Sequence, residues 1–185
     1  PFTPGIEKLW RENYGEDFAA GVWKLFMGSD DSETFRYRYR VILRDLLEEN
    51  YFGKVRVWCN AHNLLFSGHL MMEETCGSQI TRAGACMPYY KYFDIPGIDV
   101  LGGAMNWVDD PINPVDPGNV MADNKTLVTV ASQCVSAARQ AGQKHILAEM
   151  YGVTTENMTF RDMLNMFDSY AAIGISHRSV HGIFY

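Results

Sequence analysis

Cysteine is scarce in this chain, and long apolar runs are absent from it. The four cysteines lie far apart and never form a C-x-x-C pair, so we expect buried free thiols instead of a disulfide framework or a zinc knot. No apolar stretch approaches the roughly 20 residues that span a bilayer, and the opening residues lack the basic-then-apolar pattern of a signal peptide. We therefore expect no membrane partner, while periplasmic or secreted localisation stays open because a signal peptide can lie upstream of Pro1.

An excess of positive charge is also lacking. The chain has 16 Lys and Arg against 22 Asp and Glu, a formal net charge of -6, so no overall basic field attracts a phosphate backbone. Nucleic acid is therefore not an expected partner. The balance of 47% hydrophobic and 21% charged residues over 185 positions is typical of a folded globular domain with a sizeable core.

Long amphipathic stretches alternate with short apolar runs that end in polar residues, which is the pattern of βα units. Residues 35–62 carry apolar side chains three or four positions apart and predict one helix that is disturbed at Gly53. Strands are predicted at residues 64–70, 98–101, 145–150 and 175–180. Further helices are predicted within residues 78–93, from Asp123 or Asn124 to Gly142, and from the capping pair Thr159 and Asp162 to Gly174.

Such units close either as a doubly wound sheet or as a (β/α)8 barrel, and both place ligand sites at the carboxyl ends of the strands. No glycine-rich nucleotide motif follows any predicted strand, which favours the barrel. Because a whole barrel needs about 250 residues and eight strands, we predict an α/β fold: a partial TIM-type barrel of about four parallel strands with flanking helices over residues 35–185. Residues 1–34 are predicted to form short helices that lead into it or are inserted. The open sheet edges predict self-association or pairing with the rest of the barrel.

Acidic residues follow two of the predicted strands. Glu149 comes directly after an apolar run, where an unpaired carboxylate is costly unless the site uses it, and Glu73 and Glu74 follow the first strand. Two carboxylates at one mouth suit glycoside hydrolysis, in which one protonates the leaving oxygen while the other activates water or attacks the anomeric carbon. The alternatives are an ion pair of Glu149 with Arg178 or Lys144, and a helix-dipole role for Glu73 and Glu74. Glu74 is the preferred catalytic member of that adjacent pair.

Other polar and aromatic residues near the strand ends are predicted to bind the sugar. Trp107 lies inside the long polar loop of residues 102–123, where an indole ring can stack on a sugar. His177 and His181 have the spacing of two metal ligands on a helical turn, but on a strand they would lie about 13 Å apart. Core histidines are the alternative. The predicted substrate-binding residues are His69, Asn106, Trp107, His177, Arg178 and His181.

Four segments, taken together and in this order, resemble a known family: SGHLMMEET (67–75), YFDIPGIDVL (92–101), ASQCVSAARQAGQKHILAEMYG (131–152) and GISHRSVHGIFY (174–185). They are similar to the catalytic barrel of bacterial glycosidases of glycoside hydrolase family 106, the α-L-rhamnosidases. The resemblance implies a (β/α)8 barrel, an inverting mechanism and a calcium ion near the sugar. It also implies a catalytic pair made of Glu149 and either Glu74 or Glu73.

Three functions are open at this point. The first is a glycoside hydrolase fragment that cleaves a terminal bond, for example an α-L-rhamnoside, with two glutamates as general acid and base. The second is a non-catalytic carbohydrate-binding or assembly module. The third is a metal-dependent hydrolase that uses His69, Glu149, His177 and His181. Calcium binding by the aspartates of residues 102–123 has less support, because their spacing is not that of a calcium loop.

Overall fold

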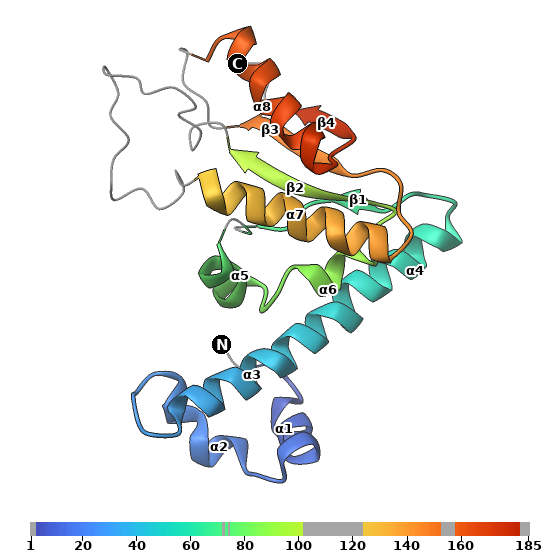
Figure 1. The fold of residues 1–185 in the computed structure, drawn as a ribbon. Helices are drawn as coiled ribbons and strands as arrows, with labels where there is room; N and C mark the ends of the chain where they lie inside the picture. The colour runs from blue at the N-terminus through green and yellow to red at the C-terminus, as the bar shows by residue number, and fades with distance from the viewer. Residues whose placement is uncertain (1–2, 72, 74, 102–123, 153–157, 182–185) are drawn as a thin grey trace.

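The computed structural model describes residues 3–71, 73, 75–101, 124–152 and 158–181. Within them the chain forms an α/β fold with a four-stranded parallel sheet in the order β1-β2-β3-β4 and flanking helices (Figure 1). The α/β class and the parallel pairing that the sequence predicts are confirmed. The strands are β1 (Ser67–Gly68), β2 (Ile95–Leu101), β3 (Leu147–Gly152) and β4 (His177–Val180).

One face of the sheet is covered by helices. Helix α7 (Asn124–Gln140) contacts β2 and lies beside α8 (Phe160–Ile173), and α6 (Met87–Tyr90) packs against α7 (Figure 1). Alternate residues of β2 and β3 are buried in this layer. They are Ile98, Val100, Ala148 and Met150 on the sheet, packed with Ala131, Cys134 and Ala138 of α7. The intervening residues of β2 and β3 therefore point to the opposite face.

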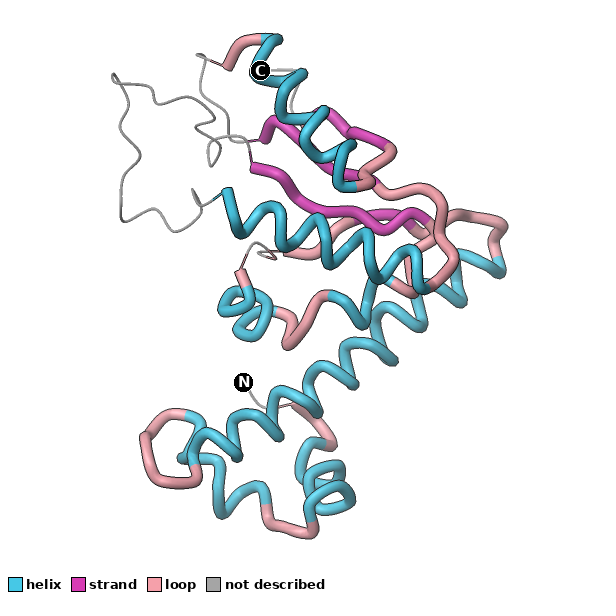
Figure 2. The backbone as a smooth tube through the Cα atoms, viewed as in Figure 1, coloured by secondary structure: helices cyan, strands magenta, loops and turns pink. Residues whose placement is uncertain are grey.

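The long helical segment predicted for residues 35–62 is present and starts slightly earlier. It consists of α3 (Ser32–Leu47), a π-helical stretch η2 (Glu48–Gly53) and α4 (Lys54–Ala61), drawn as one rod in Figure 2. The predicted disturbance at Gly53 is the π stretch, which widens the helix where Phe52 stacks on Tyr89 of α6 at 4.6 Å between ring centroids. The rod thereby joins the N-terminal helices to the sheet.

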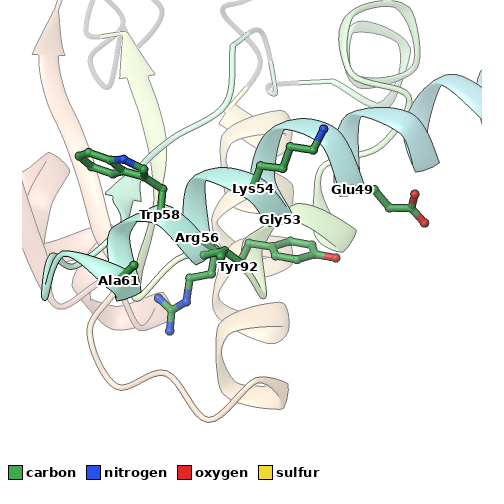
Figure 3. A pocket seen from close by; sticks show the side chains of 8 residues that line it. Glu49, Gly53, Lys54, Arg56, Trp58, Ala61 and Tyr92 are labelled. Carbon is green, nitrogen blue, oxygen red and sulfur yellow. The ribbon is translucent and has the colours of Figure 1, made fainter.

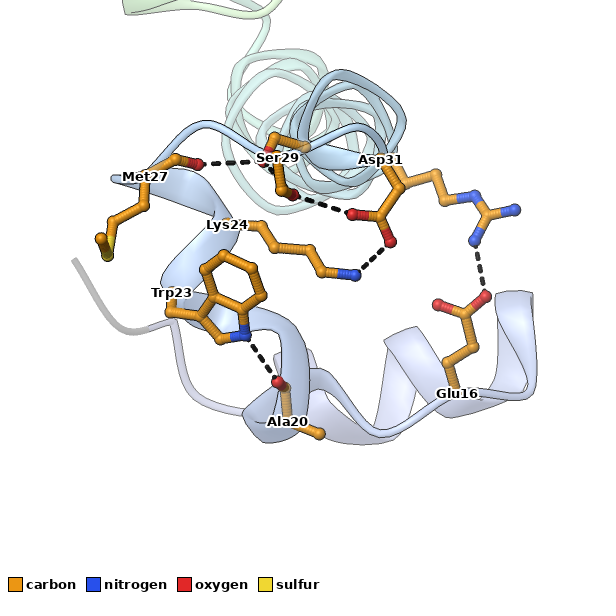
Figure 4. Close-up of polar contacts among 9 residues, drawn as sticks. Glu16, Ala20, Trp23, Lys24, Met27, Ser29 and Asp31 are labelled. Carbon is orange, nitrogen blue, oxygen red and sulfur yellow. Dashed lines mark hydrogen bonds and ion pairs between the residues drawn. The ribbon is translucent and has the colours of Figure 1, made fainter.

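The N-terminal helices are α1 (Ile6–Tyr14), α2 (Phe18–Gly21) and the 3-10 helix η1 (Val22–Leu25). They pack against α3 through an aromatic cluster that includes Trp10, Phe18 and Phe35. Because α3 begins at Ser32, it crosses the boundary that the sequence predicts between residues 1–34 and 35–185. Ion pairs of Lys24 with Asp31 and of Arg38 with Glu16 tie the cluster together at its surface (Figure 4).

Helix ends follow the predicted signals. Thr159 and Asp162 form a reciprocal capping box at the start of α8, and Gly174 ends that helix. Gly142, at φ 77°, terminates α7. The segment of residues 78–93 differs from the prediction, because it contains two short helices, α5 (Cys76–Arg82) and α6, separated at Gly84 with φ 81°. Glycine adopts this left-handed backbone conformation at little steric cost because it has no Cβ.

The first strand is much shorter than the predicted residues 64–70. Asn63, at φ 55°, turns the chain at the end of α4, and the N–H of Leu64 bonds back to the carbonyl of Cys59. The N–H of Phe66 then bonds to the carboxylate of Asp94 at 2.8 Å instead of to a strand. The carbonyl of Phe66 accepts the N–H groups of Asp94 and Ile95, and the residues in register with β2 are Ser67 and Gly68.

All four cysteines are free thiols: Cys59, Cys86 and Cys134 are buried as predicted, whereas Cys76 is exposed. Among the described helices, none combines the length and the apolar composition that crossing a bilayer requires.

Candidate active site

Acidic and histidine side chains gather on the face of the sheet that points away from α7. Asp99 of β2, Glu149 of β3 and Ser179 of β4 occupy one register row across three neighbouring strands. Residues in register on parallel strands point to the same face. His69 follows β1 and His181 follows β4, so both ends of the row carry an imidazole.

Glu149 lies at the centre of this group. Its Oε2 is 3.1 Å from Nε2 of His69, and its Oε1 is 3.8 Å from Nε2 of His181. The Glu149 side chain is 32% exposed, so it is shielded by the sheet but still open to a ligand. The alternative that Glu149 pairs with Arg178 or Lys144 is not what the structure has; the histidines are its partners.

The ring of His69 is fixed on both sides. Nδ1 lies 2.8 Å from the carbonyl oxygen of Leu70, and Nε2 faces Glu149. Burial acts to lower the pKa of His69, but the bond to Leu70 and the carboxylates of Asp99, Glu73 and Glu149 outweigh it, so the pKa is raised overall.

Glu73 has a different environment from Glu149, because its side chain is completely buried. Oε1 accepts the backbone N–H of Asp99 at 2.6 Å, and Oε2 accepts the N–H of Leu70 at 3.3 Å and the hydroxyl of Tyr90 at 2.9 Å. Burial raises the pKa of Glu73 to about 7, although these donors act in the opposite direction. The carboxyl group therefore fastens the segment after β1 to β2 and α6.

A second layer of hydrogen bonds holds the same segment in place. The side-chain amide of Gln79, a buried residue of α5, donates to the carbonyl oxygen of Glu73 and to Oε1 of Gln133 in α7, both at 2.8 Å. Glu73, four residues after His69, is thus held by contacts from β2, α6 and α5, and α5 is in turn bonded to α7. Such a supporting shell fixes the geometry of a functional side chain.

The structure brings together some of the predicted site residues and separates others. Glu73, Glu149, His69 and His181 lie in one neighbourhood. Arg178, in register with buried Ala148, lies on the helix-covered side, where its guanidinium stacks over Phe167 and lies 3.4 Å from the Tyr151 hydroxyl. Three predicted residues lie outside the described residues, and they are Glu74, Asn106 and Trp107.

His177 begins β4 instead of following a strand. It is in register with Leu147, the first residue of β3, and its ring packs edge-on against His145 at 4.9 Å between centroids. Its Nδ1 is 2.9 Å from the hydroxyl of Ser176. His177 therefore lies toward the amino ends of the strands, two residues before the row of Glu149, and His181 is the histidine at the carboxyl end.

Asp99 is the residue that sequence reasoning missed. It stands between Ile98 and Val100 in an apolar run that was interpreted as a buried strand without a functional side chain. The available signal is the alternation Ile98-Asp99-Val100, because an acid between two apolar strand residues points to the face opposite theirs.

The described residues include no cluster of three or more histidine, cysteine or acidic side chains arranged to hold a metal ion. The calcium ion implied by the family resemblance therefore has no fitting donor set in the described part of the chain. The acidic residues of 102–123 lie outside it.

A separate hollow of about 700 Å³ lies on the surface of α4, away from the carboxylate row (Figure 3). Its wall is formed by aliphatic and aromatic side chains with a few charged ends. The lining residues are Glu49, Gly53, Lys54, Arg56, Val57, Trp58, Ala61 and Tyr92.

Comparison of this chain with family models, with curated proteins and with solved structures finds no match. The arrangement of the site therefore carries the functional argument.

Proposed function

We propose that this chain carries the catalytic carboxylate of a glycoside hydrolase, with Glu149 as that group. The observation that supports it best is the position of Glu149, half-buried in a central parallel strand, with one oxygen toward His69 and the other toward His181. Carboxylates that act on a glycosidic bond need such a fixed, partly desolvated setting.

The sheet topology supports a barrel wall as the scaffold. The strand order follows the chain order without reversal, and α6, α7 and α8 form one layer on one face. A doubly wound sheet reverses its strand order and has helices on both faces, whereas a barrel repeats the unit in one direction and turns its other face inward. On this proposal the carboxylate row lines the interior of a (β/α)8 barrel.

The contacts of the two described glutamates suggest a division of roles. Glu149 reaches the open face and accepts a hydrogen bond, as suits a nucleophile or a general base. Glu73 is buried under Asp99 and has three donors, as suits a group that holds the site together. The proton donor to the leaving oxygen then falls to another carboxyl group, for which Glu74 remains the candidate.

The substrate class follows from the polar rim and from the family resemblance. His181 and Ser179 are exposed groups that can bond to sugar hydroxyls beside Glu149. An α-L-rhamnoside is the substrate that the resemblance to family 106 glycosidases favours. Nitrophenyl α-L-rhamnoside is therefore the first substrate to test.

The experiment compares Glu149→Gln with Glu33→Gln, an exposed glutamate of α3, in the whole protein. We expect turnover of the nitrophenyl glycoside to fall about a hundredfold to ten-thousandfold in the first variant and to stay unchanged in the second. Calorimetry should still detect sugar binding by Glu149→Gln. Suppose that the parent protein binds sugar, but that its turnover is absent or is the same in Glu149→Gln. A non-catalytic binding module is then the correct function.

We also propose that β4 pairs with a further strand, either of another copy or of the remaining barrel. All four residues of β4 are exposed, including Val180. On the adjacent helix α8, Phe160 is 89% exposed and Leu164 is 54% exposed. Apolar side chains beside an outer strand are the usual sign of a surface that another element covers.

A further inference from the structure

Both ring nitrogens of His69 face oxygen atoms that accept hydrogen bonds. The carbonyl oxygen of Leu70, 2.8 Å from Nδ1, can only accept a hydrogen bond, so Nδ1 must carry a hydrogen. The carboxylate oxygen of Glu149, 3.1 Å from Nε2, also accepts when it is ionised. A neutral ring with its hydrogen on Nδ1 would direct the Nε2 lone pair at a carboxylate lone pair.

This contact therefore requires a second proton, shared between His69 and Glu149. If it resides on Nε2, the pair is an imidazolium and a carboxylate joined by a charge-assisted hydrogen bond. If it resides on Glu149, the ring is neutral. The charges around the ring decide between these two states.

Among the residues that the structure describes, acids from three segments act on the charge of His69. Asp99 faces it from β2, Glu149 from β3 and Glu73 from the segment after β1. Tyr90 of α6 acts indirectly by bonding to Glu73, and His181 lies on the far oxygen of Glu149. Asp99 and Glu149, together with Glu73 to the extent that it is ionised, add negative charge near the ring, and this charge favours the proton on the ring.

Asp99 adds a second requirement. It is in register with Glu149 on the neighbouring strand, and neighbouring strands lie only about 4.8 Å apart. A cation beside two neighbouring acids favours their charged forms. His69 contacts Glu149, and the charge of Asp99 raises the pKa of His69 more than the charge of Glu73 or Glu149 does.

We propose that His69 is held as an imidazolium and serves as the positioning residue that keeps Asp99 and Glu149 ionised side by side. Glu149 then meets its substrate as a carboxylate, ready to act as a nucleophile or base. The catalytic consequence rests on the proposed glycosidase function, but the charge state of the three residues does not. The two can therefore fail separately.

The charge state is tested by nuclear magnetic resonance of the ring nitrogens of His69 across pH, in the whole protein with labelled histidine. The His69 signals are assigned by their loss in His69→Gln. We expect both nitrogens to be protonated at neutral pH, and the titration midpoint to shift to lower pH in Asp99→Asn and in Glu149→Gln. Ser179→Ala, the uncharged member of the same row, is the matched control and should leave the midpoint unchanged. A neutral ring at pH 6, or a midpoint that ignores Asp99→Asn, overturns the proposal.

The catalytic consequence is tested by the pH profile of turnover on nitrophenyl α-L-rhamnoside. His69→Gln keeps a hydrogen-bond donor toward Glu149 but removes the charge, so we expect the acidic limb of the profile to shift to higher pH and kcat to fall about tenfold to a hundredfold. An equal loss at every pH would mean that His69 acts through structure alone and would contradict the proposal. If His69→Gln does not fold, the ring titration in Asp99→Asn, which leaves His69 in place, still decides the charge state. If the His69 ring is neutral at neutral pH while Glu149→Gln still loses turnover, the imidazolium is rejected and the hydrolase function stands.

Discussion

The carboxylate of Glu73 accepts the backbone N–H of Asp99 at 2.6 Å, so a fully buried acid fixes the position of the strand residue that faces the site. Through this bond, the segment after β1 and the strand β2 are fixed relative to each other. These two segments carry His69 and Asp99, and the bond therefore restricts the movement of both residues.

Glu73 should make the protein less stable as the pH rises. Burial raises its pKa from 4.5 to about 7 in the folded protein. Between these two values the folded state binds the proton more tightly than the unfolded state, so the stabilisation is fully present below pH 4.5 and is lost as the pH rises through about 7. The free energy of unfolding should fall by about 3 kcal/mol across this window.

Denaturant unfolding of Glu73→Gln at several pH values checks this expectation. The neutral amide cannot ionise, so the decline between pH 4.5 and about 7 should flatten relative to the parent protein. Glu33→Gln, on exposed α3, is the control and should keep the parent's pH dependence. A decline in Glu73→Gln equal to that of the parent would show that Glu73 is not its source.

Gly97 should tolerate no side chain. A Cβ at this position would lie 2.9 Å from the carbonyl oxygen of Gly68 and 3.2 Å from Cβ of Leu147, both in neighbouring strands. Gly97→Ala must push the strands apart, and we expect a loss of about 1 to 3 kcal/mol in the free energy of unfolding. Gly77→Ala, in α5, meets only Oγ1 of Thr75 at 3.8 Å and should be neutral or stabilising. Equal stabilities for the two variants would contradict the close strand packing.

Gly152 should control the position of His181. A Cβ on Gly152 would lie 3.3 Å from Cγ and 3.4 Å from Nδ1 of His181, so the ring must shift in Gly152→Ala and its 3.8 Å contact with Glu149 changes. We expect turnover to fall less than tenfold, with folding unchanged. In a His181→Ala background the same substitution should have no further effect, because its target is gone. Additive losses in the double variant would show that Gly152 acts by another route.

The outer strand should drive association. Light scattering on this chain should give a mass well above 21.0 kDa, and Val180→Lys should shift it toward the monomer because a charge on an outer strand opposes pairing. Val128→Lys, at an exposed position of α7, is the control and should leave the mass unchanged. A monodisperse monomer for the parent chain would reject the predicted pairing.

Local signals allowed much of the fold to be predicted from the sequence. Apolar residues three or four positions apart predict the helix of residues 32–61, and its π-helical stretch ends at Gly53. The capping pair Thr159 and Asp162 and the stop at Gly174 involve only neighbours along the chain. The extent of β1 depends instead on Asp94, 28 residues away from Phe66, whose N–H it binds. No local pattern reveals such a bond.

The candidate site was only partly predictable for the same reason. Glu149 and His69 could be proposed because each follows an apolar run. Which residues face them depends on strand register, which aligns Asp99 with Glu149 and turns Arg178 to the other side with Ala148. A shift of one residue in register exchanges the two faces. Without the register, the sequence does not predict that Asp99 lies beside Glu149 or that Arg178 lies on the helix-covered side.

Chemical rescue tests the role of Glu149 most directly. Removing its carboxylate in Glu149→Ala leaves room for a small anion, so added azide should restore turnover of nitrophenyl α-L-rhamnoside and yield a glycosyl azide. The predicted result is a loss of about a hundredfold or more that azide partly reverses. Parent-level turnover in Glu149→Ala, with or without azide, would contradict the account.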